Sequence, residues 1–128
     1  MKIGLTSILV DDQEKALRFY TEKLGFTLKT DIPTGEYRWL TVTSPEGVEG
    51  VELLLEPMGF EASRVYQKAL RDAGIPLTTF FTNDIDGECA KLRARGVLFT
   101  VEPTRASWGA HAVFDDTVGN LINLAEVP

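Results

Sequence analysis

The chain has 128 residues, and its 13 Lys and Arg against 19 Asp and Glu give a net charge of −6. Because the basic residues are few and scattered, we expect no nucleic-acid partner. One cysteine excludes an intrachain disulfide, and one Cys with one His cannot supply a structural zinc set. No apolar run reaches the length of a membrane span or of a secretion signal. We therefore expect a cytoplasmic protein without a membrane partner.

The first half of the chain predicts one strand, one helix and then three more strands. Asp11 and Asp12 can cap the helix, and Gly25 can end it in a left-handed conformation. The turn SPEG at 44–47 separates the last two strands. The expected segments are a strand at 3–10, a helix from Asp12 to Gly25, and strands at about 26–31, 37–43 and 50–56.

A helix predicted over 59–74 follows, and then the same pattern starts again. Val65, Tyr66, Ala69 and Leu70 are expected on the apolar side of that helix. The later segments are a strand at 77–82, a helix from Asp84 to Gly96, and strands at 97–102, about 108–114 and 120–126. The stretch PTRAS at 103–107 lies between two of these strands and is assigned to neither.

The two halves repeat one order of elements. Asp12 to Gly25 corresponds to Asp84 to Gly96, and SPEG corresponds to DTVG at 116–119, in each case 32 residues after the capping Asp. An internal repeat of this kind indicates that the fold is built from two copies of one structural unit. It predicts two βαβββ modules, at about 1–57 and 76–128, joined by the helix at 59–74 within one domain over 1–128.

Four segments carry a family resemblance. They are SILVDDQEKALRFYTEKLGF at 7–26, GVELLLEP at 50–57, TNDIDGECAKLRARGV at 82–97 and FDDTVGNLINL at 114–124. In this order and spacing they resemble the vicinal oxygen chelate superfamily, which includes glyoxalase I, bleomycin-resistance proteins and extradiol dioxygenases. The resemblance implies an α+β fold in which two tandem βαβββ modules form a curled mixed sheet around a cleft. It also implies a homodimer.

The same resemblance implies four cleft positions that hold His, Gln or Glu in the metal-dependent members. Here they correspond to Leu5, Glu52, Leu77 and Asn123. Leucine cannot coordinate a cation, and divalent metals need several oxygen or nitrogen ligands. We therefore expect no cofactor, with a divalent metal at Glu52 as the alternative, because Glu52 is the one retained ligand-type residue.

Given the cleft that the resemblance implies, alternation along the strands and the pairing of the two halves predict which residues line it. Trp39 could serve as an aromatic platform or as core, and Glu52 could face the cleft or solvent. His111, the only histidine, could act as an acid or base with Glu52 or be structural. Trp108 could form a pocket rim or a dimer contact. The expected ligand-binding set is Leu5, Ser7, Trp39, Thr41, Glu52, Leu54, Leu77, Thr79, His111, Val113, Leu121 and Asn123.

Three functions fit this sequence. The first is a metal-independent protein that binds a small cationic or aromatic ligand in the cleft. The second is a lyase, isomerase or dioxygenase of the superfamily that uses a degenerate metal site or Glu52 and His111 as catalytic acid and base. The third is a partner module without a ligand, which leaves the polar cleft residues without a role.

Overall fold

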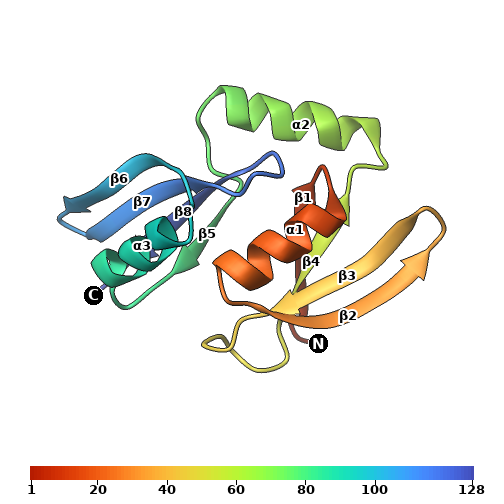
Figure 1. Ribbon diagram of the computed structural model, residues 1–128, viewed down its shortest axis with the longest axis horizontal. Helices are drawn as coiled ribbons and strands as arrows, with labels where there is room; N and C mark the ends of the chain where they lie inside the picture. The colour runs from red at the N-terminus through yellow and green to blue at the C-terminus, as the bar shows by residue number, and fades with distance from the viewer. The chain divides into compact units, whose positions relative to one another are not determined.

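A computed structural model describes residues 1–128, which divide into two compact units, Met1–Val65 and Tyr66–Pro128. Each unit contains a four-stranded mixed sheet with a helix against it (Figure 1). The predicted α+β fold and its two tandem modules are confirmed. None of the helices is both long enough and apolar enough to cross a membrane.

The first sheet has the strand order β1-β4-β3-β2. Strands β1 and β4 are parallel, whereas β4, β3 and β2 are antiparallel neighbours. Helix α1 begins after Asp12, whose carboxylate accepts a hydrogen bond from the Lys15 amide at 3.0 Å, as the predicted cap requires. The elements are β1 (Leu5–Val10), α1 (Gln13–Arg18) continued by the π-helical turn η1 (Phe19–Lys23), β2 (Thr27–Thr34), β3 (Tyr37–Thr43) and β4 (Glu52–Pro57).

The second sheet repeats this arrangement in the order β5-β8-β7-β6, again with one parallel pair, β5 and β8. Asp84 caps its helix by accepting from the Gly87 amide at 3.0 Å. Strand β6 runs through Ala106 and so extends beyond the expected end at residue 102 to include most of PTRAS. The elements are β5 (Thr78–Phe81), α3 (Ile85–Ala94), β6 (Phe99–Ala106), β7 (Gly109–Asp115) and β8 (Leu121–Glu126).

Each sheet buries the residues that face its helix. In the first unit Ile8, Val10, Leu40 and Val42 are buried with Ala16 of α1. In the second unit the buried set is Ile85, Cys89 and Leu92 of α3 with Ala112, Phe114, Ile122 and Leu124 of the sheet. Burial raises the pKa of the Cys89 thiol. These apolar faces leave the opposite face of each sheet for polar and aromatic residues.

Helix α2 (Glu61–Asp72) spans the boundary between the units and corrects one expectation. Val65 and Tyr66, expected on its apolar side, are 62% and 55% exposed, whereas Gln67 is buried. The reason is hydrogen bonding: the Gln67 amide donates to the Val118 carbonyl at 3.2 Å and to Asn120 Oδ1 at 3.0 Å. Because buried polar groups need hydrogen-bond partners, these bonds turn Gln67 toward the protein interior, and the residues expected on the apolar side face solvent.

Candidate functional site

The residues predicted to line the cleft in the first module share one face of the first sheet. Leu5 pairs with Glu52, and Ser7 and Thr41 both pair with Leu54. Paired residues point to the same side of a sheet, and residues two apart on a strand also share a side. Trp39 therefore belongs to this face as well, which is the one opposite α1. The structure brings all six predicted residues of this module together.

Glu52 lies half-buried at this face and is held by a neighbouring hydroxyl. The Thr41 hydroxyl, which is fully buried, donates to Glu52 Oε1 at 2.7 Å. In this unit the Arg38 guanidinium forms close ion pairs with Glu14 and Asp31, and not with Glu52. Glu52 is therefore a carboxylate without a cationic partner. On the same face Leu54 is 8% exposed, and Leu5 and Trp39 are 41% and 45% exposed.

The second module presents a matching face opposite α3. Asn123 pairs with both Thr79 and Val113, and the Leu77 amide donates to the Leu121 carbonyl at 2.9 Å. The Asn123 amide nitrogen donates to the Thr79 hydroxyl oxygen at 3.2 Å. By strand alternation His111 shares this face with Val113. The six predicted residues of the second module are thus together too.

Trp108 extends this second face. Its ring centroid lies 5.9 Å from that of His111, with the ring planes tilted by 48°, and the side chain is 49% exposed. Sequence reasoning left Trp108 open as a rim or a dimer contact. Its place directly before the strand that carries His111 is the signal that could have assigned it to the ligand face. The acid–base pairing of Glu52 with His111 joins residues of two units and stays a prediction.

Strand pairing corrects the alignment of the two modules. Leu5 pairs with Glu52 in the first, and Leu77 bonds to Leu121 in the second, so Glu52 corresponds to Leu121. Asn123 corresponds to Leu54 and not, as expected, to Glu52. Leu54 pairs with Thr41 and Asn123 pairs with Val113, which are equivalent residues of the two modules. The difference arises in the segment before β4, where the Val51 amide donates to the Val48 carbonyl at 3.4 Å and adds a turn.

The side chains at these positions do not fit the divalent metal that the family resemblance implies there. With Leu5 and Leu77 fixed, the remaining two positions are either Glu52 and Leu121 or Leu54 and Asn123. Either set contains a single oxygen donor side chain, which is too few for a divalent cation. The structure contains no group of three His, Cys, Asp or Glu side chains placed to hold a metal.

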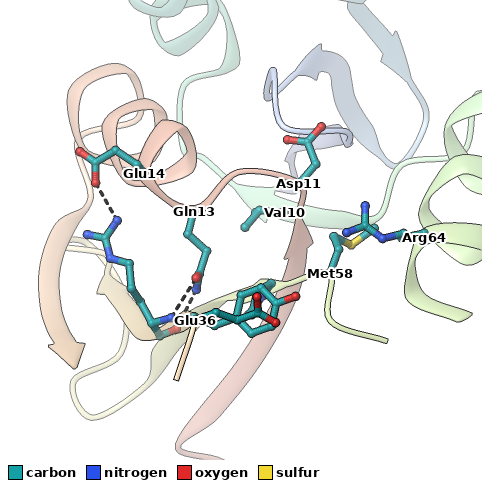
Figure 2. A pocket seen from close by; sticks show the side chains of 10 residues that line it. Val10, Asp11, Gln13, Glu14, Glu36, Met58 and Arg64 are labelled. Carbon is teal, nitrogen blue, oxygen red and sulfur yellow. Dashed lines mark hydrogen bonds and ion pairs between the residues drawn. The ribbon is translucent and has the colours of Figure 1, made fainter. Parts of the chain in front are cut away.

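A separate pocket of about 290 Å³ opens in the first unit, at the ends of β1 and β4 and the start of β3 (Figure 2). None of the predicted ligand residues lines it. Its rim contains Glu14, whose carboxylate accepts from Arg38 at 2.6 Å. The lining residues are Val10, Asp11, Gln13, Glu14, Glu36, Tyr37, Arg38, Pro57, Met58 and Arg64.

The protein is therefore of the paired βαβββ class. Each of its two tandem units has a helix on one sheet face and polar and aromatic residues on the other. The model of the Glyoxalase/Bleomycin resistance protein/Dioxygenase superfamily matches residues 2–124. The chain belongs to that superfamily.

Relatives and solved structures agree with this assignment. The chain is 51% identical to the uncharacterized protein YurT of Bacillus subtilis (strain 168), over 98% of this chain and 99% of that protein. The crystal structure of UcmS2 is similar with a TM-score of 0.83 and 33% identity, covering 98% of this chain and 97% of that chain. TnmS3, an antibiotic binding protein from Streptomyces sp. CB03234, is also 33% identical, with a TM-score of 0.78, covering 100% of this chain and 97% of that chain.

Proposed function

We propose that the protein binds a small cationic or aromatic organic ligand on its two helix-free sheet faces, without a resident metal. The observation that carries the proposal is the Glu52 carboxylate, which has no cationic partner and lies on the sheet face that Leu5, Leu54 and Trp39 share. A half-buried carboxylate and an exposed indole on one sheet face suit an ammonium or a flat cation, because ion pairing and cation–π attraction both favour such a ligand. The likeness to TnmS3, an antibiotic binding protein, supports ligand binding rather than a partner module without a ligand.

The two tryptophans of the chain give a direct assay, because Trp39 lies on the first face and Trp108 on the second. A panel of cationic aromatic drugs and their neutral analogues is titrated while tryptophan emission and thermal stability are followed. We expect a cationic aromatic compound to quench emission and to raise the melting temperature, since a ligand that binds only the folded state stabilises it. Trp39→Phe and Trp108→Phe separate the contributions of the two faces.

The charge of Glu52 is tested by Glu52→Gln. Loss of a charge-assisted contact of roughly 1.5–3 kcal/mol weakens binding by about 10- to 100-fold. We expect that loss for the cationic compound and little change for its neutral analogue. Glu49→Gln removes an exposed acid just before the same strand and serves as the control.

Equal losses for charged and neutral compounds would contradict the role of Glu52. Turnover of the compound that survives a chelator and disappears in His111→Ala would replace sequestration with metal-free catalysis. The homodimer and the cytoplasmic location stay predictions.

A further inference from the structure

Strands β3 and β4 separate soon after they meet. Only Thr41 with Leu54 and Val42 with Leu53 form regular pairs between them. In the second module β7 and β8 form six pairs, from Ala110 with Glu126 to Asp115 with Leu121. Pro57 at the end of β4 has no N–H group, so it cannot continue the ladder. The gap between the strand ends leaves backbone groups that need other partners.

The side chain of Gln13 fills this gap. Its amide nitrogen donates to the Arg38 carbonyl at 2.7 Å and to the Leu55 carbonyl at 3.0 Å. Its amide oxygen accepts from the Arg38 amide at 3.0 Å. Figure 2 shows this side chain reaching from the start of α1 to the strand ends. One glutamine thus replaces a missing stretch of strand and satisfies three backbone groups on two strands.

The second module shows that this device is particular to the first. Ile85 holds the position of Gln13, since each directly follows the capping Asp. The Ile85 side chain is fully buried and offers no hydrogen bond. No substitute is required there, because β7 and β8 stay paired to their ends. The polar residue occurs in the module where the ladder is broken.

We infer that Gln13 is a positioning residue for the ligand face of the first module. It holds both backbone groups of Arg38, the residue before Trp39, and the carbonyl of Leu55, the residue after Leu54. Trp39 and Leu54 are the aromatic and apolar parts of that face. Without Gln13 the start of β3 keeps its pairs with β2 but loses its link to β4, so Trp39 is held from one side only and moves more freely. The inference rests on the proposed function only for the statement that Trp39 contacts a ligand.

The test uses tryptophan fluorescence in the full chain without any ligand. In a Trp108→Phe background, Gln13→Ile installs the residue of the second module and removes all three hydrogen bonds. We expect acrylamide quenching of Trp39 to rise about twofold and its anisotropy to fall, because side-chain motion increases exposure. In a Trp39→Phe background the same substitution is expected to leave Trp108 unchanged.

Two further variants keep the result interpretable. Glu14→Gln removes the ion pair to the Arg38 side chain but leaves its backbone bonds, so Trp39 is expected to stay as in the parent protein. Gln13→Glu keeps the acceptor for the Arg38 amide and loses both donors, so it is expected to give an intermediate effect if Gln13→Ile fails to fold. Equal changes at both tryptophans, or no change at Trp39 in either Gln13 variant, would overturn the inference. If the Gln13 variants change the Trp39 signal but the parent protein binds none of the compounds, only the proposed function is overturned.

Discussion

Gly119, at the turn before β8, is required by two independent constraints. Its φ of +103° is rare for residues with a side chain. A Cβ atom there would also overlap the amide of Gln67, the buried residue of α2. The same turn is held by Asp116, whose fully buried carboxylate accepts from the amides of Val118 at 3.0 Å and Asn120 at 2.9 Å. Gln67, which lies against Gly119, also donates to Asn120, so it belongs to the same polar network as Asp116.

We predict that Gly119→Ala lowers the free energy of unfolding by about 2–4 kcal/mol, from backbone strain of roughly 1–2 kcal/mol and the added overlap. Urea denaturation measures the change. Gly35→Ala is the matched control, because Gly35 also has a positive φ, of +61°, but a Cβ atom there meets nothing within 4 Å. Equal losses for the two variants would show that Gln67 adds no constraint.

Asp31 and Arg38 give a prediction about pH. Hydrogen bonding from the Arg38 guanidinium, at 3.0 and 2.7 Å, holds the pKa of the Asp31 carboxyl below its usual range. Because the folded-state pKa is lowered, this contribution to stability is present above the unfolded value of about 3.9 and is lost as pH falls through the lowered pKa. NMR titration is expected to show the low pKa in the parent protein and a return toward about 3.9 in Arg38→Gln. An ordinary pKa in the parent protein would contradict the pairing.

At the scale of elements, the sequence predicted the order and type of the strands and helices because their signals are local. Caps at Asp12 and Asp84 and turns at SPEG and DTVG are set by neighbouring residues. What it missed depends on distant partners. Relative to the second module, β4 is displaced by three residues along the chain, after the turn at Val48–Val51, and no local signal gives the strand register. Likewise, burial of Gln67 depends on Asn120, 53 residues away.

The candidate site divides in the same way. Which residues share a sheet face follows from alternation, so all twelve predicted residues lie on the two helix-free faces. The pocket beside Gln13 could not be predicted, because it opens where a side chain rather than a strand supplies the hydrogen bonds. The ring contact between Trp108 and His111 likewise depends on how β6 turns into β7.

At the scale of the whole molecule, each module retains a helix-free sheet face, while the strand positions at which the family resemblance implies metal ligands hold one oxygen donor. We predict that the purified protein contains less than stoichiometric metal and that a chelator leaves its melting temperature unchanged. Elemental analysis and calorimetry measure these quantities, and added Zn²⁺ or Ni²⁺ is expected to give no stabilisation. Stoichiometric metal that disappears in Glu52→Ala would contradict this prediction.

The burial of Cys89 has a practical consequence. The single thiol of the chain lies in the core of the second unit, and burial raises its pKa, so the native protein offers little thiolate to a reagent. A cysteine introduced on the surface of each unit would carry a fluorescent dye or spin label without removal of the natural one. Pairs of such labels would report the distance between the two sheets in solution, with and without a bound compound.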